Sequence, residues 1–162
     1  MIIGVTGDTH NNLKNIKNIC TIFNKNGADL VFHTGDITLP KSLLAFKELN
    51  CPLEVVLGNN DIEEKESLLK ASMNFDCKIR DEPYFTIKVE KKITVLHHPE
   101  LINEEIISKS DLILHGHTHR YRLEKKADTI IFNPGECAGF MKDKNQIGII
   151  DLLNLNPKII NF

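Results

Sequence analysis

Three observations predict an α/β fold for this chain of 162 residues. Short apolar runs alternate with segments in which apolar residues recur every three or four positions, the patterns of strands and of amphipathic helices. The first three apolar runs each end at a glycine followed by a polar residue, which is typical of a strand that turns sharply into a loop. With 41% hydrophobic and 26% charged residues, the chain can bury a full core. We therefore expect one α/β domain over residues 1–162.

The first half of the chain has the pattern of a βαβαβα series. Apolar runs predict strands at 2–5, 30–33 and 53–57. A helix is expected after the first strand, because apolar residues recur at helical spacing over 13–23. A second helix is expected over 41–49. Asp61 and Glu64 resemble a capping box that opens a third helix at Asp61.

Strands dominate the second half. A hairpin is expected from 85–89 and 93–96, with its turn at 90–92, followed by a short helix through Ile106. Further apolar runs predict strands at 112–114, 129–132, 147–152 and 158–160. The sequence shows no internal repeat and no low-complexity segment that would divide the chain.

The charge balance argues against several classes of partner. Lys and Arg together number 20 and Asp and Glu 22, so the formal charge of -2 gives no overall positive field for stable binding of nucleic acid or a membrane surface. No apolar run approaches the roughly 20 residues of a membrane-spanning helix, and the first residues do not resemble a signal peptide. The four cysteines lie far apart without a CxxC pair, which is typical of reduced thiols. We expect a cytoplasmic protein.

Polar side chains that can bind a metal follow the first three predicted strands. Asp8, Asp36 and Asn59 each come directly after the glycine that ends a strand. Ligands bind at the carboxyl ends of strands in sheets of this class, so we expect these three side chains at one edge of the sheet. Asp and Asn are also common at helix caps and turns, which is the alternative explanation for each of them alone.

Histidines accompany these oxygen ligands. Asp8 and His10 are separated by one residue, as are His117 and His119, and in extended backbone this spacing places both side chains on one side. Carboxylate, amide and imidazole ligands without thiolate suit Mn²⁺, Fe²⁺, Ni²⁺ or Zn²⁺. Since more ligands are present than one ion needs, the pattern indicates two divalent ions roughly 3.5–4 Å apart, bridged by a carboxylate and a hydroxide, as in enzymes that act at phosphorus.

The order and spacing of these motifs resemble the calcineurin-like metallophosphoesterases, and in particular their small archaeal and bacterial phosphodiesterase branch. The family pattern is D-x-H, then GD, GN, a lone His after a strand, and GHxH. The corresponding elements here are Asp8-Thr9-His10, Gly35-Asp36, Gly58-Asn59-Asn60-Asp61, Leu96-His97-His98-Pro99 and Gly116-His117-Thr118-His119, with Asn133-Pro134-Gly135 similar to a later family turn. The resemblance covers most of the chain and implies a four-layer α/β/β/α sandwich with two mixed sheets.

By motif, the resemblance implies seven metal ligands. Those of one ion would be Asp8, His10 and His119, those of the other Asn59, His98 and His117, and the bridging ligand Asp36. Aligning Pro99 with the family's usual glycine selects His98, whereas a one-residue slip would select His97. We expect the remaining histidines, His33 and His115, to lie in the core or to orient a ligand.

Asn60 departs from the family pattern. Many members have a histidine after the metal-binding Asn, which donates a proton to the leaving group or holds the phosphate. Asn cannot donate an acidic proton, so that proton must come from water, from another side chain or not at all. In addition to Asp36, the candidate catalytic residues are Asn60 and Asp61, although Asp61 suits a helix cap better than a metal ligand.

The expected function is that of a dinuclear metal-dependent phosphodiesterase, with Mn²⁺ preferred over Ni²⁺, Fe²⁺ or Zn²⁺. A metal-bridging hydroxide would attack a small phosphodiester, and aryl esters would be favoured because their leaving groups depart as stable anions. A phosphomonoesterase or nucleotidase would use the same site. The alternative from another class is a protein-binding scaffold like the retromer subunit of eukaryotes, which has an impaired metal site. Small family members often pair, so a homodimer is a further expectation.

Overall fold

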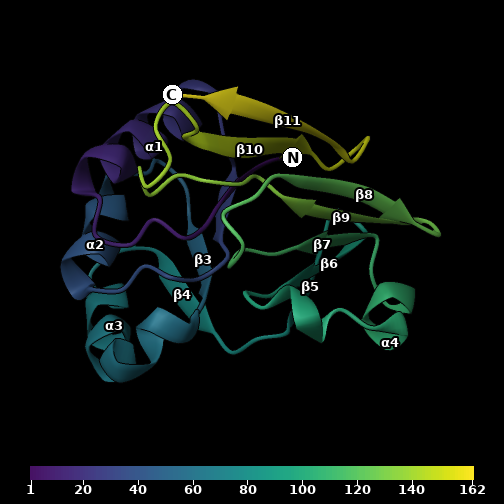
Figure 1. Cartoon of the computed structure of the whole chain (residues 1–162), viewed down its shortest axis with the longest axis horizontal. Coiled ribbons are helices and arrows are strands. Elements are labelled where there is room, and N and C mark those ends of the chain that lie inside the picture. Colours follow the sequence, from purple (N-terminus) through teal and green to yellow (C-terminus); the bar gives the residue numbers. More distant parts are fainter.

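The computed structural model describes residues 1–162 as four stacked layers (Figure 1). Three helices cover the outer face of a six-stranded sheet, a five-stranded sheet packs against its inner face, and one short helix covers the far side. The helices are α1 (Leu13–Lys25), α2 (Pro40–Ala45), α3 (Lys65–Ser72) and α4 (Glu104–Ser108), with short 3-10 helices at Phe46–Glu48, Asn59–Glu64 and Pro99–Leu101. None of the helices combines the length and the apolar character needed to cross a membrane.

The six-stranded sheet has the order β11-β10-β1-β2-β3-β4. Its strands are β1 (Ile2–Thr6), β2 (Leu30–His33), β3 (Leu53–Val56), β4 (Cys77–Arg80), β10 (Gln146–Asp151) and β11 (Asn156–Asn161). The first four strands run parallel, because a helical segment joins each to the next, and β10 and β11 add to β1 as an antiparallel pair. The carboxyl ends of β1, β2 and β3 therefore meet at one edge.

The five-stranded sheet has the order β5-β6-β7-β9-β8. Its strands are β5 (Tyr84–Lys88), β6 (Lys91–Val95), β7 (Leu112–Leu114), β8 (Arg122–Lys126) and β9 (Thr129–Asn133). The central strands β6, β7 and β9 are parallel, and β5 and β8 flank them as antiparallel edges. The loops that follow β6 and β7 complete the edge at which the first three strands end.

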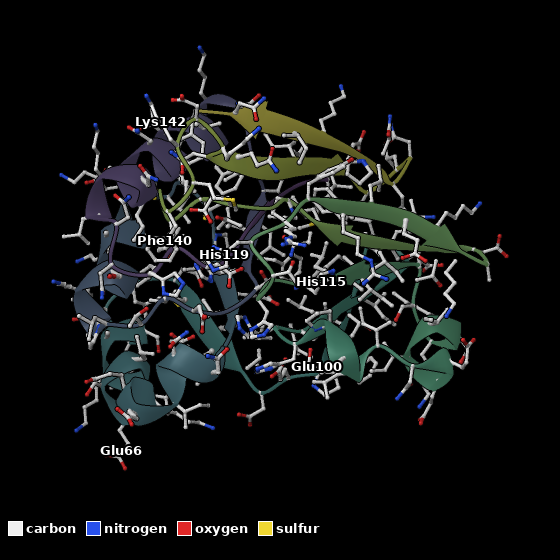
Figure 2. All side chains as sticks on the ribbon, in the orientation of Figure 1. Glu66, Glu100, His115, His119, Phe140 and Lys142 are labelled. Atoms are coloured by element: carbon white, nitrogen blue, oxygen red, sulfur yellow. The ribbon has the colours of Figure 1, made fainter.

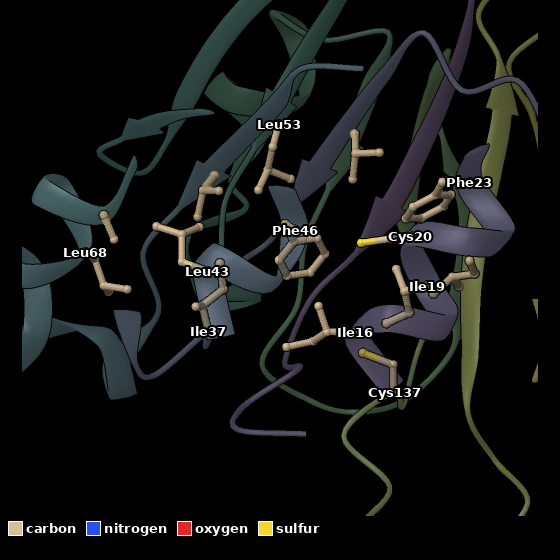
Figure 3. Close-up of a cluster of buried hydrophobic side chains, with 14 of the residues drawn as sticks. Ile16, Ile19, Cys20, Phe23, Ile37, Leu43, Phe46, Leu53, Leu68 and Cys137 are labelled. Carbon is tan, nitrogen blue, oxygen red and sulfur yellow. The ribbon is translucent and has the colours of Figure 1, made fainter. Parts of the chain in front are cut away.

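Apolar residues pack against both faces of the six-stranded sheet, which explains why its central strands are mostly apolar. On β1, Ile3 and Val5 pack between the two sheets, whereas Gly4 faces α1. A Cβ at Gly4 would lie 2.6 Å from a ring carbon of Phe23, so glycine lets the helix approach the strand closely. Figure 3 shows the cluster beneath the helices, in which Phe23, Phe46 and their neighbours are fully buried.

The observed fold class and the two mixed sheets confirm the expectation from sequence. Two strands, β4 and β8, were not expected from the sequence. Both lie at an edge of their sheet: β4 alternates half-buried apolar residues with exposed charged ones, and β8 is exposed except at Arg122. Edge strands do not need an apolar run, and so they lack the signal by which the central strands were found.

Three boundaries differ from the prediction. The helix expected over 41–49 changes to a 3-10 helix after Ala45. The hairpin turns at Val89 and Glu90, which have φ angles of 48° and 62°, rather than at 90–92. The third helix does not open at Asp61, because a 3-10 helix covers Asn59–Glu64 and α3 begins after it.

Candidate metal centre

Metal-binding side chains meet where five parallel strands end. Asp8 and His10 follow β1, Asp36 follows β2 and Asn59 follows β3, all from the six-stranded sheet. From the other sheet, His97 and His98 follow β6, and His117 and His119 follow β7. The convergence agrees with the rule that sites form at the carboxyl ends of parallel strands. Both sheets therefore contribute to the same cluster.

The backbone of these loops is left-handed at the ligand positions. Asp8, His10, Asp36, His117 and His119 have φ angles of 51°, 45°, 58°, 70° and 52°. The expectation that extended backbone would align Asp8 with His10, and His117 with His119, was wrong, since all four residues lie outside the strands. Such angles are uncommon outside glycine and are tolerated mainly by Asn, Asp and His. The left-handed backbone at these positions, rather than strand geometry, directs the side chains toward one point.

Hydrogen bonds between the loops hold this arrangement. The backbone N–H of Asp8 donates to Gly35 O at 2.8 Å, and that of His117 donates to both carboxylate oxygens of Asp8 at 3.0 and 3.1 Å. Close approach also requires glycine at 58, because a Cβ there would lie 2.2 Å from Asp36 Oδ1. The motif glycines thus serve packing between loops as well as turning of the chain.

His97, His117 and Asn59 form one side of the cluster. His97 Nε2 lies 3.1 Å from Asn59 Oδ1 and 3.1 Å from His117 Nδ1. The other ring nitrogen of His97, Nδ1, lies 2.8 Å from the Thr34 carbonyl oxygen and donates to it. In the neutral ring this bond fixes the proton on Nδ1 and leaves the Nε2 lone pair facing Asn59.

Asp8, His10 and His119 form the other side. His119 Nε2 lies 3.5 Å from His10 Nε2 and 3.7 Å from Asp8 Oδ1. His119 Nδ1 lies 2.5 Å from Glu136 Oε2 and donates to it, so the lone pair of Nε2 also faces inward. Glu136 is only 1% exposed and was not singled out from the sequence.

Asp36 lies between the two sides. Its Oδ2 is 3.9 Å from His10 Nε2 and 3.6 Å from His97 Nε2. Asn60 donates to both oxygens of this carboxylate, from its backbone N–H at 2.9 Å and its side-chain amide at 2.7 Å. Burial alone would raise the pKa of Asp36, but the Asn60 hydrogen bonds and the neighbouring His97 hold it below its ordinary value. Asp36 therefore remains ionised at neutral pH.

The chemistry of this donor set fits divalent cations. Lone pairs of His97 and Asn59 face one another across 3.1 Å with no hydrogen between them, an arrangement that a cation between them would satisfy. Burial raises the pKa of Asp8 to about 7, despite the opposing effect of His119, and a nearby cation would favour its charged form. Within each of three groups of side chains, the potential ligand atoms all lie within 4.8 Å of one another. The groups are His97 with His98 and His117, Asp8 with His10 and His119, and Asp8 with Asp36 and His97.

The structure favours His97 over His98 as the ligand that follows β6. His97 is fully buried and faces both Asn59 and Asp36, whereas His98 Nδ1 pairs with Glu82 Oε1 at 2.5 Å, toward the edge of the cluster. The alignment on Pro99 selects His98, which belongs to the same candidate group as His97 and His117. Ile93 and Val95 of β6 face the space between the sheets, and His97 continues that alternation.

The structure places Asn60 and Asp61, the further candidate catalytic residues, in hydrogen bonds to neighbouring loops. The Asn60 amide is committed to Asp36 and does not project freely toward a substrate. Asp61 is fully buried, and its carboxylate accepts from the backbone N–H groups of Gly58, Asp36 and Thr38 at 2.7, 2.8 and 2.6 Å. Asp61 joins the loops after β2 and β3 instead of capping α3 from its first residue or binding a metal.

Comparisons with known proteins agree on one family. A model described as the calcineurin-like phosphoesterase superfamily domain matches residues 1–154. The chain is 34% identical to phosphodiesterase MJ0936 of Methanocaldococcus jannaschii over 93% of each protein, and 24% identical to phosphodiesterase YfcE of Escherichia coli strain K12 over 81% of this chain and 76% of the relative. The solved structure of an archaeal phosphodiesterase superposes with a TM-score of 0.87 at 30% identity and covers 100% of both chains.

Proposed function

The chain belongs to the calcineurin-like phosphoesterase superfamily and is a metal-dependent phosphoesterase, and from this premise we propose that it is a dinuclear phosphodiesterase for small phosphodiesters. The observation that carries the proposal is the position of Asp36 between two sets of inward-facing ligands. One carboxylate that touches both sets is the arrangement that a pair of neighbouring cations requires. The names of the two relatives support a diester as substrate.

Seven side chains would hold the two cations. The first set is Asp8, His10 and His119, the second is Asn59, His97 and His117, and Asp36 is shared. When bound, divalent ions at such a site lower the pKa of a water molecule and offset negative charge on the phosphate. Mn²⁺ is the proposed ion, with Ni²⁺, Fe²⁺ and Zn²⁺ as alternatives, because the donors are imidazole, carboxylate and amide.

The protein's own residues fix the geometry of the ligands. Thr34 O and Glu136 each accept from the Nδ1–H of a ligand histidine, which aims the opposite nitrogen inward. Asn60 holds Asp36 by two hydrogen bonds, so the shared carboxylate does not need to reorganise when a substrate binds. A site held in this way lowers the barrier through preorganisation.

A preference for diesters with good leaving groups is part of the proposal. The position that carries a proton-donating histidine in many family members is Asn60, and its amide already binds Asp36. No acidic proton is therefore available from this position. The scaffold alternative is not favoured, since every ligand position holds a side chain that can bind a metal.

A screen of metals against substrates tests the proposal. The purified chain is stripped of metal, reloaded with Mn²⁺, Ni²⁺, Fe²⁺, Zn²⁺ or Mg²⁺, and assayed on bis(4-nitrophenyl) phosphate and on 4-nitrophenyl phosphate. We expect two metal ions per chain by elemental analysis, the highest rate with Mn²⁺ and faster cleavage of the diester. Full activity at one ion per chain would contradict the dinuclear site. Faster cleavage of the monoester would favour the phosphomonoesterase alternative.

A further inference from the structure

Phe140 is an exposed aromatic residue beside the candidate metal centre. Its side chain is 70% exposed, on the segment that joins β9 to β10, and Figure 2 shows it next to His119. The ring centroid lies 5.1 Å from that of His10 and 5.6 Å from that of His119, with an angle of 28° to the latter ring. One face of Phe140 thus covers the two histidines, and its other face is open to solvent.

Hydrogen bonds from the site hold the segment that carries Phe140. Glu136 uses one oxygen for His119 Nδ1, and its second oxygen accepts from the Phe140 backbone N–H at 2.8 Å. Asn12 and Asn15 at the start of α1 donate to the carbonyl oxygens of Ala138 and Cys137 at 2.7 and 2.8 Å. The same buried carboxylate therefore positions a proposed metal ligand and the aromatic ring.

A surface hollow lies directly beside this ring. Its lining residues are His10, Asn11, Asn12, Leu13, Ala138 and Phe140. Asn11 uses its Oδ1 to accept from Ser42, which leaves its amide N–H groups for another acceptor. The hollow thus combines an aromatic face, a small apolar wall and amide donors next to a proposed metal ligand, as is typical of a site for a flat polar ring.

We propose that Phe140 determines substrate specificity by stacking against an aromatic ring in the ester group that remains on the phosphate after cleavage. This inference rests on the proposed phosphodiesterase function and adds the chemical class of the esterifying group. The hollow is lined by both His10 and Phe140, so a group attached to a phosphate at the metal centre would extend into the hollow beside the ring. The ring is either a nucleobase or a simple aryl group, since both present a flat π face.

A fluorescence titration tests stacking without any reaction. The chain contains no tryptophan, so the variant Phe140→Trp carries a single tryptophan at the proposed platform, which is excited selectively over the two tyrosines. We expect saturable quenching by uridine 5′-monophosphate or by phenyl phosphate, and none by ribose 5-phosphate at the same concentration and metal content. The ligand that quenches at the lower concentration distinguishes a nucleobase from an aryl group. Equal quenching by all three would overturn the proposal, because the phosphate alone would explain it.

Steady-state kinetics provide the second test. Thymidine 5′-(4-nitrophenyl) phosphate, bis(4-nitrophenyl) phosphate and methyl 4-nitrophenyl phosphate release the same 4-nitrophenolate and differ in the group that remains on the phosphate. For Phe140→Ala we expect KM to rise on the order of 10-fold for an aromatic remaining group, as loss of one stacking contact predicts, with little change for the methyl ester. Phe140→Leu should resemble Phe140→Ala, since it restores bulk but not stacking.

Met141→Ala is the matched control, since Met141 is the next residue, is 41% exposed and does not line the hollow. It should leave the KM of every ester near the wild-type value. Equal losses of Phe140→Ala on aromatic and methyl esters would mean that the ring only shields His10 and His119, and unchanged kinetics would mean that it has no role; either result overturns the inference. Failure of the phosphodiesterase proposal is distinguishable, because the wild-type protein would then lack activity while the titration still reports stacking.

Discussion

His97 and His119 lie on opposite sides of Asp36, and their surroundings differ. His97 is fully buried, and its Nδ1 donates to a backbone carbonyl, that of Thr34. His119 has a side chain that is 20% exposed, and its Nδ1 donates to the carboxylate of Glu136. A backbone acceptor is fixed by the fold, whereas a carboxylate is a side chain that substitution can change. The backbone acceptor therefore holds His97 in place whichever side chains change, whereas the carboxylate beside His119 is a point at which substitution can adjust metal affinity.

Asp36→Ala should have the largest effect, because it removes the carboxylate that both sides share. We expect loss of activity below detection and loss of metal from both sets of ligands. Elemental analysis of the reloaded variant, with circular dichroism to verify folding, checks this. A variant that kept two ions per chain and most of its activity would show that the two sides are independent.

His97→Ala should be more damaging than His98→Ala. His97 faces Asn59 and Asp36, so its loss should weaken metal binding by on the order of 100-fold or more, since even residues that only orient a ligand contribute about 10–100-fold. His98→Ala should retain two ions per chain. Metal titration of the two variants in parallel compares them directly. The reverse order would return the ligand role to His98.

Glu136→Gln should selectively weaken the ligand set that contains His119. The amide cannot stabilise the His119 ring as a carboxylate does, so we expect affinity for one of two ions to fall by about 10–100-fold while the other ion is retained. Two-site titration by calorimetry resolves the two affinities. If the affinities for both ions fell equally, the carboxylate would support the whole cluster and not only the ligand set that contains His119.

His33 gives the smallest expected effect, on stability instead of activity. It is fully buried behind the site, receives a hydrogen bond from the Gly35 N–H at Nδ1 and contacts Thr9 Oγ1 through Nε2 at 2.9 Å. Burial lowers its pKa to about 3. The unfolded chain takes up a proton near the ordinary value of 6.5 and the folded chain does not, so this contribution is present above that pH and declines as the pH falls.

The measurement for His33 is the free energy of unfolding of wild type and of His33→Gln at pH 7 and pH 5. Linkage between these pH values reduces the wild-type advantage by about 2 kcal/mol. The difference between the two proteins isolates this residue from Asp8, whose raised pKa acts in the opposite direction. A difference that did not change with pH would contradict a buried neutral imidazole.

The sequence predicted those parts of the molecule that depend on local pattern. Apolar runs predicted β1, β2 and β3. The glycine and polar residue after each run predicted that Asp8, Asp36 and Asn59 lie close together. Edge strands β4 and β8 were missed because neither contains an apolar run: β4 alternates half-buried and exposed residues, and β8 is mostly exposed. The class of the fold follows from the buried strands alone, which is why it was predicted correctly without the edges.

Contacts across loops were beyond the reach of pattern. No helical or strand periodicity relates Glu136 to His119. The two meet only because β9 packs beside β7. The choice between His97 and His98 did have a usable signal. Ile93 and Val95 face the space between the sheets, and counting in steps of two reaches His97. An alignment on a family glycine selects His98 instead, and the parallel metal titrations decide between the two.

The left-handed backbone at five of the proposed ligands also restricts how such a site can drift during evolution. Positions with φ angles near 50° to 70° accept Gly, Asn, Asp or His far more readily than β-branched residues. Most substitutions at Asp8 or His119 that preserve the loop therefore introduce a residue that can still bind a metal. Lineages of this chain that lose the metal should accumulate Asn and Gly at these positions before Val or Ile, so the loops would outlast the chemistry they support.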